Sequence, residues 1–565
     1  MQAISIGHAG ILIRTQGITI ACDPWFEPAF FGSWFVFPRN DQLAPDIMHD
    51  VCNPDFLYIS HLHGDHFDAE FLTKHMNKNT TVLLPDFPTR EMEREFNKLG
   101  FRNFVRTIGA KEHLIAPNVT IAIHAETSIT DGPGGDSALM VSDGEARLVN
   151  QNDCRTNDLT ALLEHGPVDL HWLQFSGAIW YPMVYEMDEA KKKQLCVEKV
   201  ESQFARATRY VEAIHATTVV PSAGPPCFLD PELFSLNMIT GDEISIFPDQ
   251  TEFQCRLSDE GRLNAATTIP GTTFTVLGGG VTVEQPMSGE DITRIFTHKA
   301  EYLTKYQADY AQWLVDARAS WASPSTDIIA TLKLWWEPLM AMATSVRTGI
   351  GANCLLNADN IQIYINFADG LVEPYTDQPF GFRFDIARDL VENVVAKRAV
   401  DWSNSLFLSA RFTAWRAGDY NEYIYNFFKS LSVERMTRTE SEAKSKLNGV
   451  PSNEGDIEIG DYTVQRRCPH RNADLSVFGE IDGDDLVCTL HGWRFDLETG
   501  ACRNAEERPI RVTKRSELLD LVEHHGQLAP DGEAVFHTAS QLTAGMRVSH
   551  QAWPCDHIAH WHVCI

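Results

Sequence analysis

Four residues near the carboxyl end of the chain combine the side-chain types that bind iron–sulfur clusters and metals. Cys468 and His470 share one short segment, and Cys488 and His491 share another, 17 residues further on. Two thiolates can hold one iron of a [2Fe–2S] cluster while two imidazoles hold the other. A Cys₂His₂ zinc site needs the same residue types, but zinc fingers place the cysteines together and the histidines together. Since each segment here pairs one Cys with one His, the spacing favours the cluster.

The segments around these residues resemble the Rieske domain. Cys-Pro-His-Arg-Asn-Ala-Asp-Leu spans 468–475, and Cys-Thr-Leu-His-Gly-Trp-Arg-Phe-Asp spans 488–496. Respiratory Rieske proteins carry one further cysteine in each loop, whereas Ala473 and Leu490 stand at the matching positions here. The resemblance is therefore to the oxygenase and ferredoxin type. It implies an all-β domain that receives single electrons from a ferredoxin or reductase, with a cluster bound by Cys468, His470, Cys488 and His491.

A second group of ligand-type residues follows an apolar strand expected at 56–60. His61, His63, Asp65 and His66 lie within six residues. On a turn that leaves a buried strand, alternate side chains point toward one place, so these four residues can hold one metal ion or two. The alternative is a set of helix-capping histidines, which this density of ligands disfavours. Imidazole and carboxylate donors accept iron, zinc or manganese.

This motif, together with Asp23-Pro-Trp upstream, resembles the metallo-β-lactamase fold over roughly residues 1–250. The resemblance implies an αββα sandwich, a bridging aspartate and a further ligand from a later loop. Asp153 is the bridging candidate, because it follows a strand expected at 146–150. The histidine that the family carries in the 127–136 loop is missing. Asp131 has the best spacing to replace it, and Asp136 and His124 are the other candidates.

One half of this metal site is expected to be incomplete. The family's last histidine follows a strand, here expected at 217–221, and the residues after it are Ser-Ala-Gly-Pro-Pro. A single metal, or a metal with open positions, is therefore favoured over a complete di-zinc hydrolase. A redox metal is favoured as well, since zinc has no redox chemistry to match a Rieske electron donor.

The elements that must position these residues indicate an α/β protein of several domains. We expect a metallo-β-lactamase-like metal domain at 1–250, an α+β middle domain that contributes to a substrate pocket at 251–447, the Rieske domain at 448–540 and a tail at 541–565. With 565 residues, 44% hydrophobic and 22% charged, the chain can bury several cores.

Charge and cysteine usage exclude several partners. The net charge of −30 opposes binding to nucleic acid. No apolar run reaches the roughly 18 residues of a membrane helix, and no secretory signal opens the chain. Twelve cysteines, mostly isolated, predict a cytoplasmic protein with thiols available for metal binding. Assembly into a homo-oligomer stays open.

The combination of the two metal motifs predicts an oxygenase. One known family joins these modules, the CMP-N-acetylneuraminate hydroxylases, which the chain resembles at Asp23-Pro-Trp, at 61–66, at Asp131-Gly and at Asn152-Asp-Cys. In that family the Rieske domain comes first, whereas here it comes last. The resemblance implies a monooxygenase, a hydroxylase or an N-oxygenase, acting on a small molecule with O₂ and external electrons. The oxygen-activating iron, mononuclear or dinuclear, would lie in the first domain.

Two other functions compete with this one. A metal-dependent hydrolase would use a metal-bound water with Asp65 as general base, and the Rieske domain would be accessory. An electron-transfer protein would carry an inert first domain. Asp65 is the candidate catalytic residue, as the base of the hydrolase, and in the oxygenase it is one of the residues that would hold the iron.

Overall fold

The computed structural model describes residues 1–127, 134–156, 159–177, 180–237, 246–321, 327–447, 456–469, 474–489, 493–503 and 509–514. The chain divides into two compact units, Met1–Val512 and Thr513–Ile565, and nearly all of the described residues belong to the first unit. Within the described ranges, no helix is long and apolar enough to cross a lipid bilayer.

The first sheet has eight strands in the order β14-β13-β1-β2-β3-β4-β5-β6. Strands β1 to β3 are antiparallel, and β3 to β6 run parallel to one another. The strands are β1 Gln2–Gly7, β2 Gly10–Thr15, β3 Ile18–Cys22, β4 Phe56–Tyr58, β5 Thr81–Leu84, β6 Phe104–Arg106, β13 Thr273–Leu277 and β14 Gly280–Glu284.

The second sheet has six strands in the order β12-β11-β10-β9-β8-β7. Its central strands are buried almost throughout, as expected of strands that are covered on both faces. The strands are β7 His113–Ala116, β8 Val119–Glu126, β9 Asp136–Ser142, β10 Arg147–Asn152, β11 Leu170–Gln174 and β12 Thr218–Ser222.

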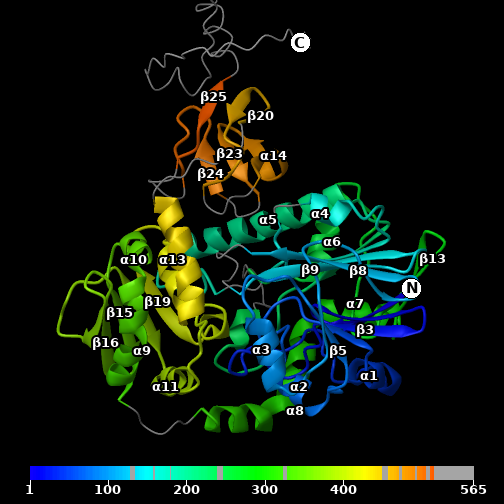
Figure 1. Ribbon diagram of the computed structural model, residues 1–565, viewed down its shortest axis with the longest axis horizontal. Coiled ribbons are helices and arrows are strands. Elements are labelled where there is room, and N and C mark those ends of the chain that lie inside the picture. The colour runs from blue at the N-terminus through cyan, green and yellow to red at the C-terminus, as the bar shows by residue number, and fades with distance from the viewer. Residues whose placement is uncertain are drawn as a thin grey trace, which may run out of the picture. The chain divides into compact units, whose positions relative to one another are not determined.

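The two sheets pack face to face, with helices on both outer faces (Figure 1). Ile11 and Ile13 of the first sheet share one buried core with Ile121 and Leu139 of the second. The helices α1 Pro45–Cys52, α2 Ala69–Lys74 and α3 Glu91–Lys98 cover the first sheet, and α4 Thr160–Leu163, α5 Glu189–Ile214 and α6 Gln250–Asp259 cover the second. These four layers are the αββα sandwich of the metallo-β-lactamase fold, so the expected fold is confirmed.

The first sheet continues beyond residue 250, where the sequence pattern placed the end of the first domain. Strand β13 pairs with β1 through Ala3 and Phe274, and β14 extends the edge. Two helices follow, α7 Gly289–Thr297 and α8 Lys299–Ala319, and Leu303 of α8 packs in one apolar cluster with Phe35 of the first domain. The sequence around β13 and β14 does not indicate which sheet these strands join, because β13 pairs with β1, which lies at the start of the chain.

The middle part of the chain folds around a third sheet, with strand order β17-β16-β15-β18-β19. Trp336 and Trp402 are fully buried in its core, with their ring centroids 5.0 Å apart. Its elements are α9 Ile328–Met342, α10 Thr344–Ile350, β15 Cys354–Ala358, β16 Ile361–Asn366, β17 Leu371–Pro374, β18 Phe382–Ile386, α11 Arg388–Ala396, β19 Phe412–Arg416, α12 Glu422–Phe428 and α13 Val433–Leu447. Two 3₁₀ turns lie at Phe234–Asn237 and Phe407–Ser409.

The carboxyl-terminal part of the first unit consists mainly of short strands. Strands β22 to β24 form an antiparallel sheet, and β20 and β21 form a hairpin. The elements are β20 Ile457–Ile459, β21 Tyr462–Val464, α14 Leu475–Phe478, β22 Gly479–Asp482, β23 Asp485–Cys488 and β24 Trp493–Asp496. Strand β25, Val512–Lys514, begins at the last residue of this unit. The expected tail at 541–565 lies outside the described residues.

Candidate metal centre and adjoining pocket

The ligand motif occupies the turn between β4 and α2. At its start, the backbone N–H of Ser60 donates to Oδ1 of Asp23 at 2.8 Å. At its end, Asp68 caps α2 by accepting from the N–H of Phe71 at 2.9 Å. The Asp68 carboxylate also accepts from two backbone N–H groups of the segment that follows β3. The turn is therefore fixed at both ends by buried carboxylates.

His66 lies at the centre of the candidate ligand group. Its Nε2 is 3.6 Å from Oδ2 of Asp65 and 3.7 Å from Oδ1 of Asp153. His61, His66 and Asp153 each offer a ligand atom within 4.8 Å of the others. His61, Asp65 and His66 are buried. The structure thus brings together four of the residues that the sequence nominated.

A fifth residue joins this group that the sequence reasoning missed. Nε2 of His8 is 3.1 Å from Oδ2 of Asp65, and His8, Asp65 and His66 form a second group of ligand atoms within 4.8 Å of one another. His8 stands alone in the turn between β1 and β2, with a φ of 51°. The one available signal was a lone histidine between Gly7 and Gly10 at the end of a buried strand.

His8 occupies the side of the site where the family histidine after β12 is missing. The N–H of Ala223, just beyond β12, donates to the carbonyl of His8 at 3.1 Å. The loop that lacks the histidine therefore lies against the turn that supplies one. The half-site expected to be incomplete has an imidazole beside it, contributed by a turn of the first sheet.

The position of Asp153 depends on a bulge at the end of β10. The register of β10 against β11 shifts between Asn150 and Asn152, and Asn152 has a φ of 53°. A bulge redirects the side chains that follow it. The amide of Asn152 donates to Oδ2 of Asp23, which lies 3.5 Å from Nδ1 of His66. Asp23 thereby orients the central imidazole, as a carboxylate behind a metal-bound histidine does.

The remaining sequence candidates lie in different surroundings. His63 has its Nδ1 2.7 Å from Nε2 of His61. Asp136 lies 3.3 Å from Nδ1 of His61, so its carboxylate stands behind that ring. His124 lies 2.7 Å from the hydroxyl of Thr156 and belongs to neither ligand group. Asp131 lies outside the described residues.

The electrostatics of the site keep its key carboxylates ionised. Burial opposes the charged form of Asp65, but the neighbouring His66 and His8 outweigh it and lower the pKa of Asp65. Asp153 follows the same balance: burial opposes its charge, but His66 and His61 lower its pKa to about 2. Burial, reinforced by His61, lowers the pKa of His63, which favours its neutral imidazole. Burial opposes the charged form of His66, but Asp65 and Asp153 outweigh it and raise the pKa of His66. Because metals bind ionised carboxylates and neutral imidazoles, a metal that binds His66 must displace a proton from its ring.

The donor set fits a metal ion. Nε2 of His66 and Oδ1 of Asp153 are buried side-chain atoms without a hydrogen-bond partner among the described residues. Buried polar atoms in proteins are nearly always satisfied, so a bound ion is the natural partner of these two. Nitrogen and oxygen donors of this kind accept iron, zinc or manganese.

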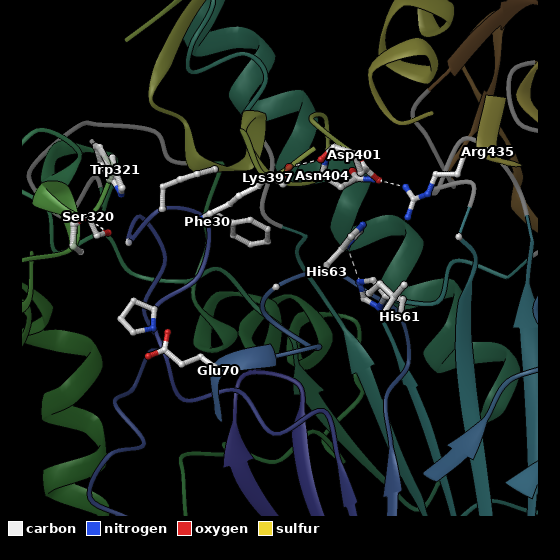
Figure 2. A pocket seen from close by; sticks show the side chains of 18 of the residues that line it. Phe30, His61, His63, Glu70, Ser320, Trp321, Lys397, Asp401, Asn404 and Arg435 are labelled. Carbon is white, nitrogen blue, oxygen red and sulfur yellow. Dashed lines mark hydrogen bonds and ion pairs between the residues drawn. The ribbon is translucent and has the colours of Figure 1, made fainter. Parts of the chain in front are cut away.

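A cavity of about 500 Å³ opens beside the motif (Figure 2). His61 and His63 line it on the metal side, and Phe30 reaches toward it from the segment after β3. Its volume is within the usual range for small-molecule sites. The other lining residues are Pro28, Phe31, Gly32, Leu62, Gly64, Glu70, Gly134, Gly135, Trp313, Ala317, Ser320, Trp321, Lys397, Asp401, Asn404, Ser405 and Arg435.

The far wall of the cavity comes from the middle part of the chain. Arg435 is buried there between Glu91 of α3, at 2.9 Å, and Asp401, at 2.8 Å. Figure 2 shows Arg435 beside Asp401 and Asn404, facing the motif histidines. Because Glu91 belongs to the sandwich and Asp401 to the third sheet's domain, this guanidinium joins the two domains.

Two cysteines of the expected cluster site are buried in the apolar cluster of the second sheet and its covering helices. Cys468 and Cys488 are 1% and 0% exposed, and both belong to the apolar cluster that contains Phe204 of α5. His470 and His491 lie outside the described residues.

Comparison with known proteins identifies the family. Residues 452–514 match the Rieske [2Fe-2S] domain, and residues 328–445 match the Rv3818-like, SCP2-like domain. The Rieske 2Fe-2S iron-sulfur protein Rv3818 of Mycobacterium tuberculosis is 42% identical over 522 residues, which cover 91% of this chain and all of the relative. The chain belongs to the Rv3818-like family of Rieske proteins. This Rieske protein therefore carries a [2Fe–2S] cluster domain that exchanges electrons with a redox partner.

Two further similarities cover only part of this Rieske protein. The N-acyl-phosphatidylethanolamine-hydrolyzing phospholipase D 1 of Caenorhabditis elegans is 26% identical over 141 residues, 25% of this chain and 33% of the relative. The diiron β-hydroxylase CmlA of Streptomyces venezuelae superposes with a TM-score of 0.33 and 16% identity, over 49% of this chain and 54% of its own.

Proposed function

We propose that this Rieske protein is a non-haem iron oxygenase, a monooxygenase or hydroxylase that oxidises a C–H or N–H bond of a small organic molecule. The observation that carries the proposal is one chain that holds both a Rieske domain and a buried imidazole–carboxylate group opening on a cavity. In the balanced reaction, substrate, O₂, two electrons and two protons give the hydroxylated product and water. A ferredoxin or reductase supplies the electrons.

The chain's own residues have distinct parts in this reaction. His8, Asp65, His66 and Asp153 would hold the iron, with His61 completing the group on the cavity side. The iron, when bound, supplies the redox chemistry that activates O₂. Asp23 fixes the ring of His66 through its carboxylate. Cys468 and Cys488 would bind the cluster together with His470 and His491.

The cavity supplies orientation and water exclusion. Phe30, Phe31, Trp313 and Trp321 give it an aromatic wall that suits the apolar part of a substrate. The opposite wall is polar, with Asp401 and other residues of the SCP2-like domain. A substrate held between these walls lies directly against the motif histidines, which is the placement that the reaction requires.

A hydrolase is the second candidate. The partial similarity to a phospholipase D favours it, and the same donor set would suit zinc and a metal-bound water. Asp65 is then a weaker general base than the sequence implied, because its carboxylate already faces both His8 and His66. The Rieske domain would have no part in such a reaction.

Metal analysis after anaerobic purification distinguishes the two candidates. An oxygenase should contain iron beyond the roughly two atoms per chain of the cluster, whereas a hydrolase should contain the cluster iron plus zinc. The oxygenase should also consume O₂ only when a chemical reductant or a ferredoxin is supplied.

Two variants separate the contributions of the two centres. Cys488→Ser should remove the visible absorption of the cluster, and His66→Ala should remove the additional iron while leaving that absorption intact. Cys255→Ser, at an exposed cysteine outside both sites, is the control and should change neither. Reductant-dependent O₂ consumption that survives Cys488→Ser would rule out the relay of electrons through the cluster.

A further inference from the structure

Tyr210 of α5 connects the Rieske domain to the segment that carries Asp153. Its side chain is buried, and its hydroxyl donates to the carbonyl oxygen of Thr156 at 3.0 Å. Its ring contacts the ring of Phe478 edge to face, with the centroids 5.7 Å apart and the planes at 73°. The neighbouring Arg209 forms an ion pair with Glu480 of the Rieske domain. Two adjacent α5 residues therefore hold the two domains in contact.

On the Rieske side, the contact leads directly to a candidate cluster ligand. The carbonyl of Phe478 accepts from the backbone N–H of Thr489 at 2.7 Å and from its hydroxyl at 3.0 Å. Thr489 is the residue after Cys488. Between the ring of Tyr210 and the thiol of Cys488, the connection therefore consists of one ring contact, one hydrogen-bonded peptide and covalent bonds.

On the sandwich side, the contact leads to the candidate metal ligand. Thr156 follows Asp153 by three residues, a span of at most about 11 Å even in a fully extended chain. Cys154 within this span is 1% exposed. Cys154, Tyr210, Phe478 and Cys488 all belong to a single buried apolar cluster, so the connection runs through packed protein.

We propose that Tyr210 is the positioning residue for electron transfer from the cluster to the metal held by His66 and Asp153. The inference rests on the proposed oxygenase function. One electron from a ferredoxin-class donor reduces the cluster. With both groups bound, the cluster would return to its oxidised form as that electron converts a ferric ion held by His66 and Asp153 to the ferrous state. Electronic coupling is stronger across bonds, hydrogen bonds and packed rings than across water-filled gaps, so Tyr210 sets the rate by excluding such a gap.

The test is the rate of this internal transfer in the full-length protein with both iron centres loaded and oxidised. A photoreductant delivers one electron to the cluster in a laser flash under anaerobic conditions, and the return of the oxidised-cluster absorption is followed in time. Three variants are compared with the wild type: Tyr210→Leu, which removes the ring contact and the hydrogen bond, Tyr210→Phe, which removes only the hydrogen bond, and Phe204→Leu. Phe204 lies on the same helix but packs on Phe253, so it is the matched control.

We expect the internal transfer to be several-fold slower in Tyr210→Leu, to be slowed less in Tyr210→Phe, and to be unchanged in Phe204→Leu. Iron content and the reduced-cluster electron paramagnetic resonance signal should be the same in all four proteins, which shows that both centres remain intact. Equal transfer rates in the wild type and Tyr210→Leu would overturn the role of Tyr210 but leave the oxygenase proposal standing. A wild-type cluster that stays reduced after the flash would instead overturn the oxygenase proposal and, with it, this inference.

Discussion

Nε2 of His8 lies 3.1 Å from Oδ2 of Asp65, although 57 residues separate them in the chain. His8 belongs to the turn between β1 and β2, and Asp65 to the motif after β4. If His8 is a ligand, His8→Ala should lower the content of non-cluster metal without loss of the cluster. Elemental analysis, with visible absorption as the measure of the cluster, checks this. His298→Ala, at an exposed histidine remote from the motif in sequence, serves as the control. Unchanged metal content in His8→Ala would show that the imidazole only packs beside the site.

Asp23 is expected to support metal affinity from behind His66. Replacing its carboxylate with an amide in Asp23→Asn should weaken metal binding by about 10- to 100-fold, the usual effect of losing a carboxylate behind a ligating histidine. A competition titration with a chromogenic chelator measures this. Asp143→Asn removes a buried carboxylate that accepts from Thr15 instead, so it should affect folding stability but not metal affinity.

Arg435 is expected to stabilise the contact between the sandwich and the SCP2-like domain. Arg435→Met leaves Glu91 and Asp401 without their buried cation, which should cost about 3–5 kcal/mol of unfolding free energy. Denaturant unfolding measures the loss.

The chain offers a matched control for this prediction. Arg94 of α3 pairs with Glu434 beside Arg435, but both side chains are about half exposed. Arg94→Met should therefore cost about 1 kcal/mol or less. Equal unfolding free energies of the two variants would contradict the prediction that burial makes the Arg435 ion pairs more stabilising.

His171 is expected to make the fold sensitive to acid. Burial lowers its pKa to about 3, while its Nε2 lies 2.9 Å from Oε1 of Gln151. The unfolded chain takes up a proton near the ordinary histidine pKa of about 6.5, whereas the folded chain does so only near 3. Stability is therefore full above about pH 6.5 and falls progressively as the pH drops toward about 3.

The comparison of wild type with His171→Gln isolates this titration. The free-energy difference between the two proteins should shift in favour of the variant as the pH falls from about 7 toward about 4, since the variant has no imidazole to protonate. Other titrating groups are common to both proteins and cancel. A difference that does not change with pH would contradict the prediction.

The sequence nominated those candidate residues that directly follow a strand, the 61–66 motif and Asp153. The structure brings His61, Asp65, His66 and Asp153 of this set together. His8 was missed because nothing near it in sequence resembles a ligand, and only the order β1-β2-β3-β4 of the first sheet brings its turn to Asp65. The cavity could not be predicted either, since Phe30, Trp313 and Arg435 come from three distant segments.

The fold was predictable to a similar extent. The sandwich strands were recognisable as short apolar runs between glycine turns, and the Rieske domain as two spaced segments that each pair a Cys with a His. Strands β13 and β14 were not assigned to the first domain, because edge strands are identified by the partner that they pair with. The contact between Tyr210 and Phe478 likewise arises from tertiary packing, and no local sequence pattern predicts it.

The cavity walls come from two parts of the chain that have separate hydrophobic cores. Trp313 packs beside the sandwich, and Asp401 lies in the domain of the third sheet. A compound that fills the cavity touches both, and it can do so only while both are folded and docked. Saturating ligand should therefore couple their melting, so that calorimetry records one sharper transition at higher temperature. A thermal-shift screen of small molecules would then report on the cavity before any turnover assay exists.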